Sequence, residues 1–484
     1  MIQQVSRITN RRKDQQPEIF MIDTNTLNPY LERTPVADPA NFHGRTADVR
    51  WVLERITAPR PQCCSITGLP RIGKTSLLRF IAHPEGARGR APGFFRDLAP
   101  LLIVYVDLAL VSVAPGTRPS SEAVVRHLMR AIHREVRCQG LADDPDLTVL
   151  DQYAARARSA SDWPEVRELF TDYVYTLDGG GYRLVLLLDE LDSTTAWDPQ
   201  MAYFLRSLVM QTNTAYVTAS LEPLFELLDE HGRVSPLYNI FSTHALGLLP
   251  PEEARELLCA PAARVGVTWP PGLVEQVLSL TGRHPDLVKM AGSAMWELHT
   301  KGELLTLEAI AARVRPDADG LFRSIWRHVS EGEREALGVL VSDGVHSLAA
   351  LAALPRLQSR ALTVDQNGGT APFGTLFTGW LRERVRQARD QADLQLDGRW
   401  VTVEGQRIQL TPTEARLATY LFERRGQTCN RADLIQAIWG DEELKPDSKV
   451  LDTTVQRLRE KIERDRANPD WLITVRGEGY TLRE

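Results

Sequence analysis

The chain has 484 residues, of which 43% are hydrophobic and 25% charged, and its formal net charge is −6 at pH 7. This composition is ordinary for a globular protein, and the length predicts about three domains of roughly 100–200 residues each. The acidic balance excludes a protein that is basic over its whole surface, but it leaves open one local DNA-binding face.

The cysteines and the apolar runs bear on the compartment. None of the five cysteines belongs to a C-x-x-C pair, so no zinc site is expected, and an odd number is typical of reduced thiols in a cytoplasm. The apolar runs have the length of strands, shorter than the roughly 18 residues of a membrane span. We therefore expect a cytoplasmic protein without a membrane partner.

The first half of the chain predicts an α/β domain. Residues 1–27 are polar and irregular, which indicates a tail. Between residues 28 and 245, helical patterns alternate with apolar strand-like runs, at 63–67, 101–108, 182–190 and 215–220. Such alternation predicts a parallel sheet with helical crossovers. The run at 182–190 is apolar enough for the centre of the sheet.

The second half predicts helices and two small helical units with hairpins. Helical periodicity fills residues 246–318, and residues 319–385 combine helices with a short hairpin. Residues 386–393 are polar and resemble a linker. Residues 394–484 predict a helix–loop–helix followed by a hairpin with Gly477 and Gly479 at its turn, which is a winged helix.

A phosphate-binding motif lies between the run at 63–67 and the next helix. It consists of Gly68, four intervening residues, Gly73, Lys74 and Thr75, followed by Ser76. Its glycines allow backbone N–H groups to surround phosphates, and the helix N-terminus favours negative charge. In this strand–loop–helix context the motif predicts a P-loop that binds ATP or ADP, with Lys74 on the β- and γ-phosphates and Thr75 on Mg²⁺.

The run at 182–190 supplies the second half of the predicted site. Asp189 ends the strand at the carboxyl edge of the sheet, where open α/β sheets bind ligands, and would hold Mg²⁺ through water. Glu190 would polarise the attacking water, so Glu190 and Lys74 are the catalytic candidates. The alternative for Glu190 is a solvated carboxylate at a strand end. Thr218 and Ser220 are either γ-phosphate sensors or strand-end caps, and Arg206 is either an arginine finger or an exposed helix arginine.

An ordered series of segments resembles bacterial STAND-type ATPases, AAA-like signalling ATPases related to the archaeal ATPase group. The likeness covers about residues 28–385 and rests on NPYLERTPVADPANFHGR, CCSITGLPRIGKTSLL, LVLLLDELD, YVTAS, SPLYNIF, LGLLPPEEARELL and GRHPDLV. It implies a helical lid at 246–318, a winged helix at 319–385, and a switch that ADP closes and ATP opens into oligomers. It also implies that Gly44 and Arg45 lie near the base and ribose, and that His284 and Pro285 read the nucleotide.

The last segment closely resembles the OmpR/PhoB-type effector domain. The likeness rests on LTPTEARLATYL, LIQAIWG, LDTTVQRLREKIE and TVRGEGYTL. It implies a third helix in the major groove of double-stranded DNA and a wing at the minor groove. By position, the implied DNA-binding residues are Lys449, Thr453, Thr454, Gln456, Arg457, Arg459, Thr474, Arg476 and Tyr480. Glu460 and Glu478 depart from the basic pattern, which leaves protein docking open.

These observations predict a P-loop NTPase fold followed by a helical lid and two winged-helix domains. The leading hypothesis is an ATP-dependent switch whose nucleotide state controls homo-oligomerisation and DNA binding, with RNA polymerase or another protein as a further partner. The alternatives are a conflict or defence ATPase whose winged helices dock proteins, a DNA-loading ATPase akin to replication initiators, and a nucleotide-stabilised scaffold.

Overall fold

The computed structural model forms two compact units, Met1–Trp380 and Leu381–Glu484, which are described separately. The described residues are 27–32, 34–96, 98–111, 119–141, 144, 147–194, 199–227, 229–230, 233–234, 237–342, 348–366, 369–392, 394–403, 406–440, 448–463, 469–475 and 477–483. None of the helices in these ranges combines the length and the apolarity needed to cross a bilayer.

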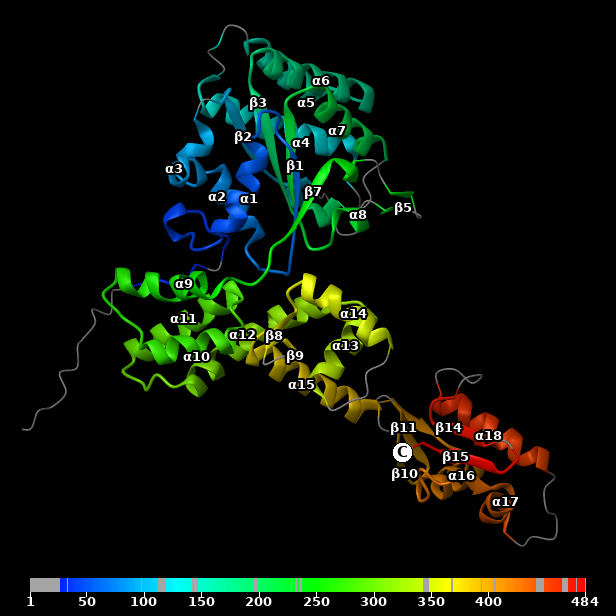
Figure 1. Cartoon of the computed structure of the whole chain (residues 1–484). Helices are drawn as coiled ribbons and strands as arrows, with labels where there is room; N and C mark the ends of the chain where they lie inside the picture. Colours follow the sequence, from blue (N-terminus) through cyan, green and yellow to red (C-terminus); the bar gives the residue numbers. More distant parts are fainter. Residues whose placement is uncertain are drawn as a thin grey trace, which may run out of the picture. The chain divides into compact units, whose positions relative to one another are not determined.

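A five-stranded parallel sheet is the centre of the first unit (Figure 1). Its order is β2-β3-β4-β1-β7, with β1 at Cys63–Thr67, β2 at Leu101–Asp107, β3 at Arg183–Asp189, β4 at Thr214–Ser220 and β7 at Phe241–Ala245. Every residue of β1, β3 and β4 is buried, as the apolar runs predict for central parallel strands. Because β4 separates β1 from β3, its carboxyl end lies between the P-loop and Asp189.

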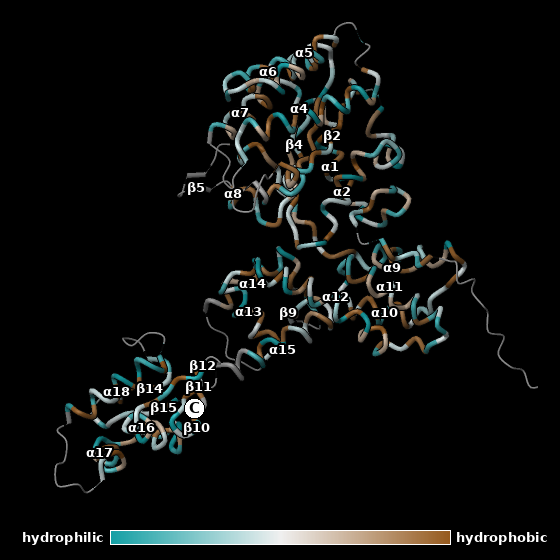
Figure 2. Tube along the Cα trace, turned by 180° about the vertical axis from the view of Figure 1, so that it is seen from behind, coloured by the Kyte–Doolittle hydropathy of each residue, from teal (hydrophilic) through white to brown (hydrophobic). Residues whose placement is uncertain are grey.

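Helices cover both faces of this sheet. Right-handed crossovers place α2 on one face and α4 to α7 on the other, since the chain moves along the sheet in opposite directions through them (Figure 1). The helices are α1 (Thr46–Ile56), α2 (Lys74–Ala82), α3 (Ala87–Arg90), α4 (Ser121–Cys138), α5 (Val149–Ser159), α6 (Trp163–Gly179), α7 (Pro199–Gln211) and α8 (Leu224–Leu227). Teal and brown alternate along α4 and α6, as expected of helices with one buried face (Figure 2).

Short elements complete this part of the unit. The strands β5 (Asp229–Glu230) and β6 (Arg233–Val234) form a hairpin. Single 3-10 turns lie at Pro39–Asn41, Pro92–Phe95, Leu108–Val111, Leu191–Thr194 and Tyr238–Ile240.

Helices and a hairpin follow the sheet, as the sequence predicts. The lid region contains α9 (Pro251–Arg264), α10 (Pro271–Thr281), α11 (Pro285–Thr300) and α12 (Leu307–Arg327). The winged-helix region contains α13 (Glu331–Val341), α14 (Leu348–Ser359), the antiparallel pair β8 (Thr363–Gln366) and β9 (Gly369–Pro372), and α15 (Thr375–Ala392). The expected boundary between residues 318 and 319 falls inside α12, and residues 386–392 of the expected linker belong to α15. The domain boundaries therefore remain proposals.

The second unit has a winged-helix arrangement. Its helices are α16 (Pro412–Phe422), α17 (Arg431–Trp439) and α18 (Ser448–Ile462), and its wing sheet has the order β13-β15-β14, from Cys429–Asn430, Gly479–Leu482 and Leu472–Val475. A capping box of Thr411 and Glu414 starts α16. Three further strands precede the helices, β10 (Gln395–Asp397), β11 (Trp400–Val403) and β12 (Gln406–Gln409). The sequence analysis did not predict this second sheet.

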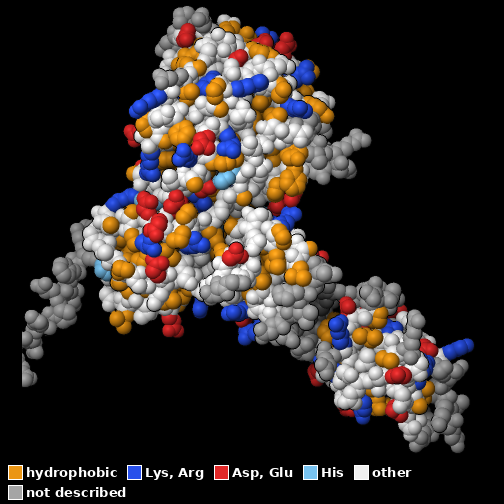
Figure 3. Space-filling model, viewed as in Figure 1, with side chains coloured by type: hydrophobic (Ala, Val, Ile, Leu, Met, Phe, Trp, Pro, Cys, Tyr) orange, Lys and Arg blue, Asp and Glu red, His pale blue; other side chains and the backbone are white. Residues whose placement is uncertain are grey.

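Acidic and basic side chains are interspersed over the face seen in Figure 3. This mixture agrees with a net charge of −6, and it means that function is best sought where a local site departs from the mixture.

Candidate functional site

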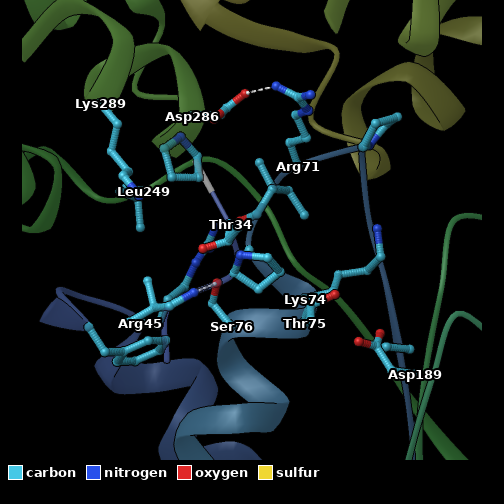
Figure 4. A pocket seen from close by; sticks show the side chains of 18 of the residues that line it. Thr34, Arg45, Arg71, Lys74, Thr75, Ser76, Asp189, Leu249, Asp286 and Lys289 are labelled. Carbon is cyan, nitrogen blue, oxygen red and sulfur yellow. Dashed lines mark hydrogen bonds and ion pairs between the residues drawn. The ribbon is translucent and has the colours of Figure 1, made fainter. Parts of the chain in front are cut away.

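The P-loop lines a cavity of about 410 Å³ between the carboxyl edge of the sheet and the lid. Ligand cavities commonly measure about 300–1,000 Å³. Lys74, Thr75 and Asp189 lie at one side of it, and Arg45, Thr34 and Lys289 lie at the other (Figure 4). Of the predicted nucleotide residues, Arg45, Gly73, Lys74, Thr75, Ser76, Asp189, Glu190 and Pro285 line the cavity.

The N-terminus of α2 is prepared for an anion. Gly73 is its N-cap, with φ of 106°, and no side chain caps the first turn. The unsatisfied N–H groups of a helix start bind phosphate. The other glycine, Gly68, allows close approach of backbone, because a Cβ atom there would lie 2.8 Å from the carbonyl oxygen of Leu246.

Lys74 is the cation at this helix start. Its Nζ donates to the carbonyl oxygens of Gly68 at 2.9 Å and Leu69 at 3.1 Å. Burial lowers the pKa of Lys74 to about 8, although the carboxylates of Asp192, Glu190 and Asp189 act in the opposite direction. The carboxylates near Lys74 and the Thr75 hydroxyl supply hard oxygen ligands, which Mg²⁺ prefers. The chemistry of this set therefore fits a Mg²⁺ ion bound beside phosphates.

The carboxylate of Asp189 is held in place by its neighbours. It is 2% exposed, and its Oδ2 accepts a hydrogen bond from the Tyr105 hydroxyl on β2 at 2.8 Å. Its Oδ1 accepts from the backbone N–H of Glu190 at 3.0 Å. Glu190 has φ of 55°, a left-handed conformation that is uncommon outside glycine and recurs at functional sites. Burial, followed by the charge of Asp189, raises the pKa of Glu190.

Sequence reasoning assigned no role to Asp192, which also lines the cavity. Its carboxylate accepts from the backbone N–H groups of Leu221 at 2.7 Å and Glu222 at 3.4 Å, so it ties the end of β4 to the site. Ser220 donates to the carbonyl oxygen of Glu222 at 2.7 Å, and Thr218 is buried in the sheet. Neither hydroxyl lines the cavity, which favours the capping alternative for both.

Arg45 contacts the P-loop directly. It is 4% exposed, and its Nη2 donates to the carbonyl oxygen of Ile72 at 2.7 Å. Glu253 of α9 accepts from the backbone N–H groups of Arg45 at 2.7 Å and Thr46 at 3.1 Å, so a lid residue caps α1. A Cβ atom at Gly44 would lie 2.8 Å from Glu253 Cβ. The pair predicted to approach the base and ribose therefore also joins the lid to the P-loop.

Two further contacts join the P-loop to the lid. Arg71 forms an ion pair with Asp286 of α11 at 3.1 Å, beside the cavity (Figure 4). His284 is fully buried, and its Nε2 lies 3.3 Å from the carbonyl oxygen of Pro70. Because a carbonyl only accepts, Nε2 carries the proton. Burial lowers the pKa of His284 to about 3, so the imidazole is neutral at physiological pH.

His284 also reaches the winged-helix region of the same unit. Its ring stacks on Phe373, with centroids 5.9 Å apart. Beside it, a Cβ atom on Gly282 would lie 2.6 Å from the backbone N of Gly374, and one on Gly374 would lie 2.5 Å from that of Gly282. Only glycine fits such a backbone approach. His284 thus lies beneath the P-loop, outside the cavity lining, and contacts core and winged-helix region together.

The exposed side of α18 is the candidate DNA-binding face of the second unit. Lys449, Thr453, Gln456 and Arg457 are exposed on this helix, and Thr474 is exposed on the wing. Arg476 lies outside the described residues. Among these positions Glu460 is exposed as well, so the face carries both signs of charge.

Three predicted DNA contacts require correction, because their side chains are buried within the domain. Thr454 and Arg459 are 7% exposed and Tyr480 is 5% exposed. Arg459 donates to the carbonyl oxygen of Leu472 at 2.9 Å and to the Thr474 hydroxyl at 2.8 Å. The Tyr480 hydroxyl donates to Asp452 at 2.6 Å. Arg459 and Tyr480 thus hold α18 against the wing, whereas the Thr454 hydroxyl donates to the carbonyl oxygen of Val450 within the helix at 2.8 Å.

Family models match most of the chain. The model described as Novel STAND NTPase 1 matches residues 29–328, and the model described as Transcriptional regulatory protein, C terminal, matches residues 405–482. The chain belongs to the Novel STAND NTPase 1 family. This family member is therefore a P-loop NTPase of the STAND class that carries an OmpR-type C-terminal domain.

Individual relatives agree with this division. The Walker-type ATPase PABY2304 of Pyrococcus abyssi shares the fold, with a TM-score of 0.51 and 16% identity over 73% of this chain and 99% of that chain. The probable transcriptional regulator ycf27 of Guillardia theta is 41% identical over 91 residues, which are 19% of this chain and 36% of that protein. The transcriptional regulatory protein AfsQ1 of Streptomyces coelicolor is 39% identical over 107 residues, 21% of this chain and 47% of that protein. The chain thus spans less than half the length of these curated relatives.

Proposed function

We propose that this protein is an ATP-dependent switch whose nucleotide state controls self-association and the DNA binding of its C-terminal winged helix, and thereby transcription. The observation that carries the proposal is the position of the nucleotide cavity, at the junction of core and lid. Arg45, Arg71 and His284 link the P-loop to the lid, and His284 reaches Phe373 beyond it. A ligand in this cavity therefore lies among contacts that a domain movement would break.

The proposed chemistry is ATP hydrolysis with Mg²⁺, and it requires positioning more than covalent catalysis. Lys74 and the N–H groups at the start of α2 would hold the phosphates, while Thr75 and Asp189 would hold Mg²⁺, which neutralises phosphate charge when bound. Tyr105 keeps the Asp189 carboxylate oriented. Glu190, with its raised pKa, would accept a hydrogen bond from the attacking water.

Nucleotide-gated DNA binding tests the proposal. The full chain is incubated with sheared genomic DNA of its host, with Mg²⁺-ATP or with Mg²⁺-ADP, and the retained DNA is sequenced. We expect a few repeated sites, enriched more strongly with ATP and lost in Lys74→Ala, because two tethered winged helices bind paired half-sites by effective concentration. Equal or absent enrichment in both nucleotide states would refute nucleotide-gated DNA binding.

Protein docking by the winged helix is the second candidate. The observation that favours it is the exposure of Glu460 on α18 and of Glu478 at the wing. The negative charge of each carboxylate would repel the phosphate backbone of DNA. Absence of DNA enrichment together with ATP-dependent capture of a defined protein partner would support this candidate.

Glu190→Gln is expected to preserve ATP binding and to slow hydrolysis by about 100-fold, since positioned general bases contribute roughly 10²–10⁴ in rate. Glutamine keeps the size of the side chain but cannot take the proton. Single-turnover hydrolysis and ATP titration separate the two effects. The matched control is Glu275→Gln, an exposed carboxylate of α10 that does not line the cavity, which should leave the single-turnover rate nearly unchanged. An unchanged rate in Glu190→Gln would remove Glu190 from its proposed role.

ATP affinity is expected to fall at alkaline pH. The pKa of Lys74 is about 8 in the free site, and bound phosphate favours the ammonium form and so raises it. Below pH 8 both states carry the proton and the affinity is constant; above pH 8 the free site loses the proton, and binding must restore it. We expect the Kd for Mg²⁺-ATP to rise about tenfold between about pH 7 and pH 9. Lys74→Arg, which does not titrate in this range, should give a flat profile.

A further inference from the structure

A second cavity, of about 390 Å³, lies between α4 and α5, and its lining residues are distinct from those of the nucleotide cavity. Five of its ten lining residues are arginines: Arg126, Arg130, Arg134 and Arg137 from α4, and Arg158 from α5. In a chain with a net charge of −6, such a concentration of one sign of charge calls for a physical reason.

The spacing of the α4 arginines opposes the stability of the helix. Positions 126, 130, 134 and 137 fall on one helical face and extend over about 16 Å at 1.5 Å per residue. Like charges at i and i+4 destabilise a helix, so the local sequence preference is violated here. Violations of local preference are expected at functional sites.

Carboxylates do not neutralise this cluster. Among the described residues, no ion pair joins any of the five arginines to an acid, whereas Arg255, for example, pairs with Glu252 and Glu275. The guanidinium of Arg126 is committed to the carbonyl oxygens of Ala157 at 3.0 Å and Ala160 at 2.6 Å. The nearby acid Asp151 lies 3.2 Å from Nε2 of His133. Arg134, Arg137 and Arg158 therefore offer their donors to a ligand.

The cavity has an apolar floor and cations from two helices. Met129, Ala154 and Ala157 line it and are buried. Arg137 of α4 and Arg158 of α5 line the same cavity from different helices. Burial lowers the pKa of His133 in this lining; the charge of Asp151 raises it, and the charges of Arg137 and Arg158 lower it. Converging cations suit a compact anion better than an extended nucleic-acid backbone. None of the lining residues is a Phe, Tyr or Trp, the large rings on which successive single-stranded bases stack.

We propose that the groove between α4 and α5 is a binding site for a small molecule that carries several phosphate groups, held by Arg134, Arg137 and Arg158. Guanidinium groups bind phosphate through paired, charge-assisted hydrogen bonds. The site is separate from the P-loop, so it would provide the ATPase with an input other than its own nucleotide. Its existence does not depend on the proposed DNA binding.

Cys138 gives a local readout in the full chain. This free thiol is exposed and lines the groove, whereas Cys259 is partly buried elsewhere. The experiment measures the rate at which a neutral maleimide modifies each thiol, by peptide mass spectrometry, as inositol hexakisphosphate is added. We expect the modification of Cys138 to slow at least about tenfold at saturation, with no change at Cys259, because the bound anion covers the groove.

Variants test which arginines are responsible. In Arg134→Ala/Arg137→Ala, the concentration of inositol hexakisphosphate that gives half protection should rise about tenfold or more, since each charge-assisted hydrogen bond contributes substantially. The control Arg50→Ala/Arg386→Ala removes the same charge from exposed positions and should match the wild type. Circular dichroism confirms that both variants are folded.

Several results would overturn the proposal. These are no protection of Cys138 by inositol hexakisphosphate, equal protection in the groove variant and the wild type, or equal weakening in the control. Protection by a 30-base-pair DNA duplex but not by the hexakisphosphate would also overturn it, and would assign the groove to nucleic acid.

Discussion

Replacing Lys74 with alanine is expected to weaken ATP binding at least about 100-fold. The Nζ group lies at the start of α2, where its donors now bond to the carbonyl oxygens of Gly68 and Leu69 and would turn to phosphate. Two charge-assisted hydrogen bonds of roughly 1.5–3 kcal/mol each correspond to an increase in Kd of at least about 100-fold. Isothermal titration with Mg²⁺-ATP measures this increase directly.

The loss of binding can be separated from a loss of folding. Burial lowers the pKa of Lys74, which means that the empty site holds its charge against a desolvation penalty. Removal of the ammonium should therefore leave the thermal unfolding temperature of the nucleotide-free chain unchanged or slightly higher. Lys289→Ala, on the opposite side of the cavity, is the matched control and should change the Kd less than tenfold. A Kd for Lys74→Ala within threefold of the wild type would refute the phosphate-site assignment.

The central strands and the P-loop could be predicted because their signals are local. A fully buried parallel strand is apolar along its centre, and residues 184–188 of β3 are all Leu or Val. The edge strand β7 carries no such signal, since Ser242, Thr243 and Ala245 are polar or small and the strand is largely solvent-accessible. The strands β10 to β12 have three or four residues each, too few for a clear alternation. These elements are specified by pairing with neighbours that are distant in sequence.

The sequence predicts where a functional residue lies along a helix or strand more readily than whether its side chain points into the core or toward solvent. Thr454 lies three residues from Leu451 and one from Val455, both buried, so the apolar period of α18 could have placed it inside. The burial of Arg459 had no comparable signal, because an arginine is usually exposed and its partner, the Leu472 carbonyl, belongs to the wing. The contacts of Asp189 with Tyr105 and of Arg71 with Asp286 likewise depend on the tertiary fold.

An ionic cluster joins the end of β4 to the winged-helix region of the first unit. Arg360, directly after α14, donates to both carboxylate oxygens of Glu333 at 3.3 Å and to Glu222 at 3.2 Å. Glu333 of α13 is 1% exposed, and burial raises the pKa of Glu222. Arg356 lies on the outside of the cluster, 3.0 Å from Glu226 and 3.3 Å from Glu333.

Arg360→Ala is expected to lower the free energy of local opening of α13 and α14 by about 3 kcal/mol, because removing one partner of a buried ion pair leaves the other charge uncompensated. Arg356→Ala should cost less than about 1 kcal/mol, since its side chain is 46% exposed and surface ion pairs contribute little. Hydrogen exchange measured by mass spectrometry reports opening of the two helices separately from global unfolding.

The same cluster gives a reason for nucleotide to act on the winged-helix region. Asp192, beside Lys74 in the cavity, accepts from the backbone N–H of Glu222, whose side chain meets Arg360. If this series of contacts couples the two regions, Mg²⁺-ATP should change hydrogen exchange in α13 and α14 of the wild type, and Arg360→Ala should reduce that change while ATP affinity is retained. Equal ATP responses in both proteins would show that the cluster supports the fold without transmitting the state of the cavity.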